Sequence, residues 1–123
     1  MSVNKANPRS GSWVPVFSNT TNLDSDPTIL AATFGLIGNL VTFQLLLTVD
    51  PTAAAATDYE FTLPVVPRNN FTGTAALSGV GVTATATGVA TSVNSSTRGI
   101  VNWTSGSGTA ETQAVNGSYL LDN

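Results

Sequence analysis

Carboxylates are the side chains whose type and spacing offer this chain a candidate catalytic or metal-binding chemistry. There is no His and no Cys, so the commonest general base, the strongest nucleophile and the favoured transition-metal ligands are missing. Asp24 and Asp26 are two residues apart, and Asp50 and Asp58 flank an Ala-rich segment. Such pairs serve as the acid and base of glycosidases or as ligands of Ca²⁺.

Turn formation is the simpler role for these carboxylates. The sequence after Asp24 lacks the further oxygen ligands, at regular spacing, that a calcium loop shows. Asp is also one of the residues that initiate turns and cap chain ends. We therefore expect turn-forming Asp residues, and we predict no catalytic residue, no metal site and no cofactor. A carbohydrate-active enzyme, with an Asp/Glu pair converging in a groove, is the alternative.

Two other residue sets have a functional and a structural interpretation. Trp13, Tyr59, Trp103 and Tyr119 would suit a platform on which sugars stack, but each also fits an inward strand position, so core packing is favoured. N-glycosylation triplets begin at Asn19, Asn70, Asn94, Asn102 and Asn116. A chain this rich in Asn, Ser and Thr forms such triplets by chance, and without a signal peptide we attribute them to composition.

Charge is scarce along the whole chain. Only 9% of the 123 residues are charged, against 41% hydrophobic, and the net charge is −3. Soluble domains carry about 25% charged residues, and a weakly charged surface favours self-association. We predict a subunit of an assembly. The four cations, Lys5, Arg9, Arg68 and Arg98, are too few and too scattered to neutralise a phosphate backbone, which excludes nucleic acid as a partner.

Neither a signal peptide nor a membrane span is predicted. The first 13 residues contain Lys5 and Arg9 but no apolar region, so residues 1–10 are interpreted as a polar arm that either binds an acidic partner or is solvated. Residues 29–49 carry no charge and are long enough to cross a bilayer as a helix. Two glycines, Asn39 and several β-branched residues interrupt that stretch, and flanking cations are missing, which favours strands.

An alternation of apolar and polar residues recurs along the chain and predicts an all-β domain over residues 11–123. About eight short strands at this spacing indicate an antiparallel β-sandwich or jelly roll. Gly38-Asn39 is a hairpin turn signal, and residues 18–28 are predicted to be a loop. Strands are expected within residues 13–17, 29–34, 40–49, 59–63, 74–90, 100–103 and 111–121.

Residues 40–49 carry the clearest pattern. Their odd positions are all apolar and are predicted to form the core face, whereas the even positions are mostly polar. Leu40 and Leu46 interrupt the polar face, which a solvated strand would not need and a subunit interface would use.

Three segments together resemble a recurrent pattern in virion proteins of tailed bacteriophages. They are GSWVPVF at residues 11–17, FGLIGNLVTF at residues 34–43 and the Leu63-Pro64 pair, followed by a Gly/Thr/Ala-rich segment. The resemblance implies a trimeric β-sandwich or jelly roll, found at tail-fibre ends or as a small protein bound to capsids, without a catalytic motif. Leu36 stands where that pattern has a basic or polar residue and is a third candidate for the subunit interface.

This resemblance makes a capsid decoration, or cement, protein the leading hypothesis. Such a protein is expected on the virion as a homotrimer, with Lys5, Asn7 and Arg9 of the arm contacting the major capsid protein or another virion protein. The short stretch before Trp13 favours this role over a fibre. The alternative is a tail-fibre tip that recognises host glycan through the loops at residues 18–28 and 92–98.

Overall fold

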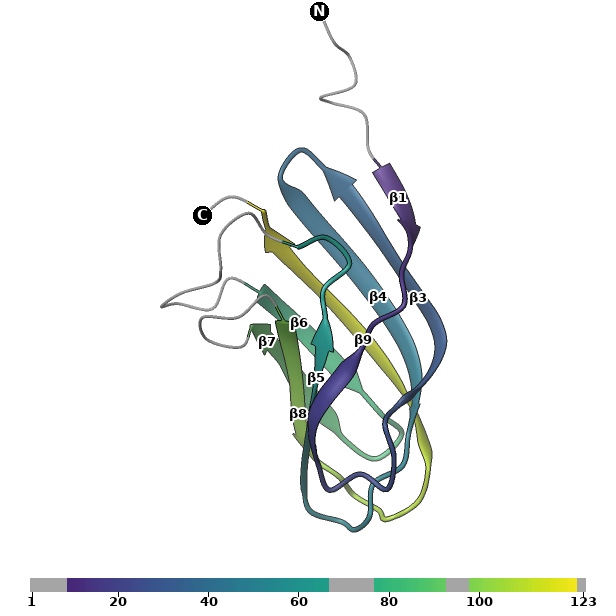
Figure 1. Ribbon diagram of the computed structural model, residues 1–123. Coiled ribbons are helices and arrows are strands. Elements are labelled where there is room, and N and C mark those ends of the chain that lie inside the picture. Colours follow the sequence, from purple (N-terminus) through teal and green to yellow (C-terminus); the bar gives the residue numbers. More distant parts are fainter. Residues whose placement is uncertain (1–8, 67–76, 93–97, 122–123) are drawn as a thin grey trace, which may run out of the picture.

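The computed structural model describes residues 9–66, 77–92 and 98–121, and these fold as an all-β domain (Figure 1). Nine strands are present in the described residues, one more than the eight predicted. They are β1 (Arg9–Ser12), β2 (Phe17–Thr21), β3 (Thr28–Ile37), β4 (Leu40–Val49), β5 (Ala56–Thr62), β6 (Leu77–Val82), β7 (Thr87–Ser92), β8 (Arg98–Thr104) and β9 (Glu111–Leu120).

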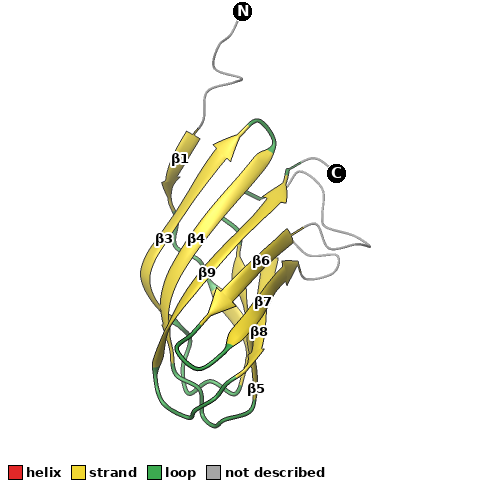
Figure 2. Ribbon diagram, turned by 180° about the vertical axis from the view of Figure 1, so that it is seen from behind, coloured by secondary structure: helices red, strands yellow, loops and turns green. Residues whose placement is uncertain are grey.

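All nine strands belong to one antiparallel sheet in the order β1-β3-β4-β9-β6-β7-β8-β5-β2. The sheet curls around its own core into a half-barrel, so that β5 and β8 lie opposite β3 and β4 (Figures 1 and 2). The all-β prediction is confirmed. The two separate sheets of a sandwich are replaced by a single sheet that bends, because β9 pairs with both β4 and β6 and joins the two halves.

A short N-terminal segment closes the open side of this half-barrel. Residues 13–16 run from β1, at one sheet edge, to β2, at the other (Figure 1). The Trp13 amide donates to the Ala32 carbonyl of β3 at 3.3 Å, and the Trp13 indole N–H donates to the Thr62 carbonyl of β5 at 3.0 Å. Trp13 therefore ties the two edges together.

Two predicted boundaries near this segment were wrong. Residues 13–17 were expected to be a strand, but only Phe17 belongs to one. The chain here crosses between edges, with Pro15 buried, and does not run along a neighbouring strand. The predicted loop at 18–28 shrinks to residues 22–27, since β2 continues to Thr21 and β3 begins at Thr28.

The β3–β4 hairpin follows the sequence prediction. Gly38 and Asn39 form a two-residue turn, with Gly38 at φ 59°, the left-handed conformation that glycine adopts readily. The predicted core face of residues 40–49 is also confirmed: Val41, Phe43, Leu45, Leu47 and Val49 are all buried.

The segment predicted as residues 74–90 is a hairpin in its described part. Thr83 ends β6 because its hydroxyl accepts from the Ala86 amide at 3.0 Å and its own amide donates to the Ala86 carbonyl at 2.8 Å. The turn at residues 83–86 then directs the chain into β7.

Aromatic rings dominate the core, and glycine on a neighbouring strand makes room for two of them. Phe43 lies opposite Gly117 on β9, and Phe61 lies opposite Gly99 on β8. A Cβ atom added at either glycine would come within 2.5 Å of the facing ring. Only glycine therefore fits at these two positions.

Two residues that the sequence analysis assigned to the arm lie in a strand. Arg9 pairs with Leu36 and Ser10 with Gly35 in the β1–β3 ladder, so both residues belong to the sheet and not to an arm. Lys5 and Asn7 lie outside the described residues.

Candidate interaction surface

The outward side of five neighbouring strands forms a continuous surface without charge. Because side chains alternate along each strand, the ladders β3–β4, β4–β9, β9–β6 and β6–β7 place the outward residues in straight rows across the sheet. We call this surface the outer face. Its residues are Ala31, Thr33, Gly35, Ile37, Leu40, Thr42, Gln44, Leu46, Ser78, Val80, Val82, Thr87, Val89, Thr91, Ala114, Asn116, Ser118 and Leu120.

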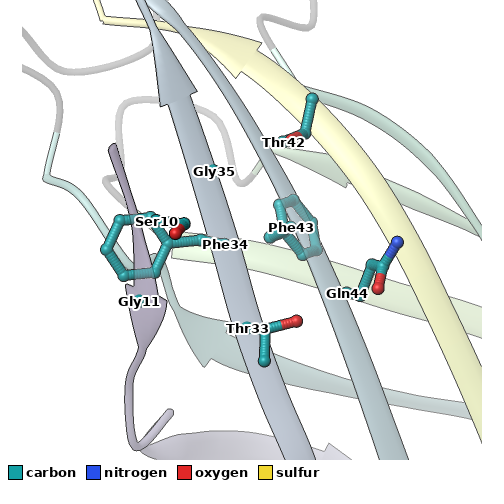
Figure 3. A pocket seen from close by; sticks show the side chains of 8 residues that line it. All are labelled: Ser10, Gly11, Thr33, Phe34, Gly35, Thr42, Phe43 and Gln44. Atoms are coloured by element: carbon teal, nitrogen blue, oxygen red, sulfur yellow. The ribbon is translucent and has the colours of Figure 1, made fainter. Parts of the chain in front are cut away.

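One half of the outer face is hollow. A depression of about 400 Å³ lies over β1, β3 and β4 (Figure 3), where Gly35 contributes no side chain and Thr33, Thr42 and Gln44 form the rim. A second depression of about 280 Å³ continues it toward Ala31. A third, of about 150 Å³, extends it toward the Ile37 end of the hairpin, between Arg9 and Leu40. We call this the hollow half.

The other half of the outer face, on β6 and β7, carries three exposed valines. Val80 is 47% exposed, Val82 46% and Val89 52%, and Val80 lies directly opposite Val89 in the β6–β7 ladder. We call these three residues the valine ridge. On the inward side of the same two strands, Gly81 and Gly88 are buried. At the ridge, therefore, glycine faces the core and valine faces outward.

Most charged side chains of the described strands lie away from this surface, on β5 and β8; Arg9 of β1 lines the smallest depression, and Glu111 stands at the start of β9. Arg98 forms an ion pair with Glu60 at 2.9 Å and donates to the Ser18 hydroxyl at 2.9 Å. Asp58 lies on the same outward side, opposite Asn102. Because the sheet curls between β7 and β5, this charged side faces a different direction from the outer face (Figure 2).

The candidate carboxylates take part in loop and turn contacts. The Asp24 amide donates to the Asp50 carbonyl at 2.9 Å, and its carboxylate accepts from the Thr52 hydroxyl at 2.7 Å. Glu111 accepts from the Thr85 hydroxyl at 2.8 Å. Across residues 9–66, 77–92 and 98–121, His, Cys, Asp and Glu form no group of three or more that could hold a metal ion.

Asn22 is a loop residue that the sequence analysis did not single out. It adopts φ 59°, and its side-chain amide donates to the Ala53 carbonyl and to the Thr57 hydroxyl, both at 2.8 Å. Its side-chain oxygen accepts from the Ala53 amide at 3.1 Å. These bonds hold the Ala-rich segment against the end of β2.

The four candidate sugar-stacking residues pack in or against the core, as the favoured interpretation predicted. Tyr59, Trp103 and Tyr119 are buried, and Trp13 makes edge contacts with Phe34 and Phe43. Burial raises the pKa of Tyr59 far above its usual range. It also raises the pKa of Tyr119 to about 12, partly offset by hydrogen bonding with the Val65 backbone. Neither ring is presented to a ligand at the surface.

The three leucines predicted to form a subunit interface lie in different environments. Leu40 and Leu46 lie on the outer face and are 43% and 39% exposed. The prediction for Leu36 was wrong, because this residue is only 5% exposed. It lies opposite Val41 in the β3–β4 ladder, and this register places its side chain on the inward face. Arg9 is exposed on β1 and lines the smallest depression.

Residues 29–49, which the sequence analysis weighed as a membrane span, form the β3–β4 hairpin. The described part of the chain contains no helix of the length and apolar character needed to cross a bilayer. Comparison of the chain with protein-family models, with curated proteins and with solved structures found no match.

Proposed function

We propose that this protein is a non-enzymatic structural protein of a bacteriophage virion, of the capsid decoration kind, that acts as an oligomer. The observation that carries the proposal is the uncharged outer face, with its exposed aliphatic side chains. Monomeric soluble domains keep exposed apolar patches small, and larger ones mark contact sites for other proteins. The sequence resemblance supplies the virion setting and implies a trimer.

The end of the outer face beside the β3–β4 hairpin is our candidate for contact with the shell. Ile37 pairs with Leu40, and Leu40 pairs with Leu120, so three exposed aliphatic residues form one row. Arg9 of β1 lines the same depression as Ile37 and Leu40, so a cation stands at the border of this row. In this proposal the major capsid protein, or another virion protein, contributes an apolar surface with an acidic group at its border.

Electron microscopy of the virus particle tests the location. Density with the symmetry of the shell, labelled by antibodies against this protein, supports decoration. Density at the tail alone would contradict it. A binding assay on shells stripped of the protein adds a residue-level test: Leu40→Lys with Leu120→Lys should abolish binding, whereas Val66→Lys, at a residue 66% exposed and outside that row, should not.

The arm hypothesis is tested separately. A chain lacking residues 1–8 keeps β1 whole, since β1 begins at Arg9. It should fold and associate as the full chain does but should no longer bind the shell. Full occupancy of shells by the truncated chain would rule out a role for Lys5 and Asn7.

A tail-fibre tip that binds host glycan is the second candidate, supported by the hollow half of the outer face. That depression is lined by the hydroxyl groups of Ser10, Thr33 and Thr42 and by the Gln44 amide, which are groups that can hydrogen-bond to sugars. Screening the intact protein on a glycan array tests this candidate. Binding that is lost in Gln44→Ala would support it, and the absence of any glycan binding would remove it.

A further inference from the structure

Asn116 stands on the outer face and is followed by glycine. Asn-Gly occurs once in the 123 residues of the chain, at Asn116-Gly117 in β9. The amide nitrogen of a glycine can attack the side-chain carbonyl carbon of a preceding asparagine, because glycine has no side chain that hinders the approach. Asn116 is exposed, so water reaches it. The pair therefore has the chemistry needed for spontaneous deamidation.

The reaction needs only water as a second reactant. The Gly117 amide nitrogen loses its proton and forms a bond to Cγ of Asn116, the bond from Cγ to the side-chain nitrogen breaks, and that nitrogen takes up a proton and leaves as ammonia. The product is a cyclic succinimide. Hydrolysis adds water and breaks a bond to the ring nitrogen. If the bond from Cγ breaks, aspartate forms at position 116. If the bond from the main-chain carbonyl carbon breaks, isoaspartate forms, and the main chain then runs through the former side chain.

The extended backbone of β9 keeps the reacting atoms apart. The succinimide ring closes only when the Asn116 Cα–C bond rotates away from the extended conformation, which a paired strand holds fixed. β9 is paired on both sides here, since Gly117 lies opposite Phe43 of β4 and opposite Gly79 of β6. An amide in such a strand faces a paired neighbour in whichever direction it points. Deamidation therefore requires a local loss of strand pairing.

Close packing adds a second constraint on the peptide between Asn116 and Gly117. A Cβ atom added at Gly79 would lie 2.4 Å from the Asn116 carbonyl oxygen and 2.8 Å from the Gly117 Cα atom. A Cβ atom added at Gly117 would lie 2.5 Å from Cζ of the Phe43 ring. The backbone of β6 and the Phe43 ring therefore hold this peptide in place from two sides.

We infer that Asn116 is a deamidation site that the folded sheet keeps closed and that becomes reactive when β9 separates from β4 and β6. The inference goes beyond the proposed function and does not depend on it. Asn102 is exposed in the same way but is followed by Trp103, whose side chain hinders the attack. Deamidation of the unfolded chain should therefore be faster at Asn116 than at Asn102.

Both products change β9. A carboxylate at position 116 stands in a row between Gln44 and Val80, on the outer face, whose residues are all uncharged. Isoaspartate also lengthens the main chain before Tyr119, so the end of β9 loses its register with β4 and β6. Tyr119 is 2% exposed, and its displacement opens the core. A chain that forms isoaspartate while unfolded should therefore not regain the native fold.

Mass spectrometry after incubation tests the inference. The wild-type chain is kept at mildly alkaline pH, either folded in buffer or unfolded in guanidinium chloride, and is then cleaved after Arg98. The peptide of residues 99–123 contains Asn116 and also Asn102, the internal control. We expect conversion of the amide to an acid at Asn116 in the unfolded chain, about tenfold or more faster than in the folded chain, with little change at Asn102.

Two variants at the same exposed position separate the causes. Asn116→Gln places the side-chain carbonyl carbon one bond further from the Gly117 nitrogen and should stay unmodified in both states. Asn116→Asp introduces the charge without the longer main chain and should refold on dilution, as measured by circular dichroism, whereas the fraction of the incubated wild-type chain that contains isoaspartate should not. Equal rates at Asn116 in the folded and unfolded wild-type chain, or an unfolded chain left unmodified there, would overturn the inference.

Discussion

The inner and outer faces of the same strands are built from different residues. On β4 and β9 the inner face carries Phe43, Val115 and Tyr119, packed so closely that the facing Gly117 has no room for a side chain. The outer face of these two strands carries Thr42, Asn116 and similar small or neutral residues, with open depressions between them. The inner face is closely packed within one chain, whereas the outer face keeps open recesses.

The difference predicts that substitutions on the inner face change folding, and that substitutions on the outer face change association. The largest change in stability caused by inner-face residues is expected at high pH, because both tyrosines of the chain lie on that face.

Raising the pH should unfold the protein through its tyrosines. The pKa of Tyr119 is raised from 10.0 to about 12 in the folded chain, and that of Tyr59 is raised further. The unfolded chain releases these protons near pH 10 while the folded chain retains them, so the stabilisation is complete below pH 10. The share from Tyr119 is lost between pH 10 and 12, and the share from Tyr59 continues to fall at higher pH. The Tyr119 shift alone corresponds to about 3 kcal/mol. Urea titrations across this pH range, with tyrosinate absorbance, measure both effects. Tyrosinate formation near pH 10 in the folded protein would contradict the prediction.

Gly117→Ala should destabilise the fold by about 2 kcal/mol, because the added Cβ overlaps the buried Phe43 ring. Gly35→Ala is the control on the outer face. There the nearest atom, the Thr42 hydroxyl oxygen, is 3.4 Å from the added Cβ, which is an ordinary contact distance. Urea denaturation of both variants at one protein concentration measures the contrast. Equal losses of stability would remove the distinction between the two faces.

Tyr59→Phe should cost about 1 to 2 kcal/mol. The Tyr59 hydroxyl donates to the Gln113 side-chain oxygen at 2.7 Å, and both residues are fully buried. Removing the donor leaves that oxygen unpaired in the core. Adding Gln113→Leu should recover most of the loss, since both polar groups are then gone. Thermal unfolding of the single and double variants provides the measurement. A double variant that is less stable than the single variant would refute the explanation.

Trp13→Phe should have the smallest effect, about 1 kcal/mol. It removes the indole hydrogen bond to the Thr62 carbonyl but retains an aromatic ring against Phe34 and Phe43. The loss should appear in amide hydrogen exchange as faster exchange at the Trp13 and Val16 amides, with β4 and β9 less affected. Unchanged exchange at the crossing segment would show that Trp13 does not hold the two sheet edges together.

Much of the inner face was predictable from the sequence. The alternation in residues 40–49 and 59–63 identified Val41, Phe43, Tyr59 and Phe61 as core residues, and Gly38-Asn39 identified the hairpin. These signals are local, because the direction of a side chain in a strand depends only on its position within that strand. Leu40 and Leu46 were recognised as outward residues for the same reason.

The hollow half and the valine ridge were not predictable in this way. The alternation of side chains along a strand puts Val80 and Val82 on one face but does not indicate whether that face is inward. The answer depends on Val101 and Val115, which occupy the space beside Gly81 and come from two other strands. Leu36 was misassigned because its inward direction is set by pairing with Val41.

By itself the sequence determined an all-β chain, poor in charge and without His or Cys, whose strands each have one apolar face, because composition and alternation are properties of neighbouring residues. The tertiary structure decided that one sheet curls where a sandwich was expected, that residues 13–16 close it, and that the depressions and the three exposed valines lie on different halves of the outer face. These features arise from pairing between strands far apart in the chain, such as β4 with β9 and β5 with β2. Local pattern carries no information about which strands become neighbours, so the outer face emerges only with the sheet.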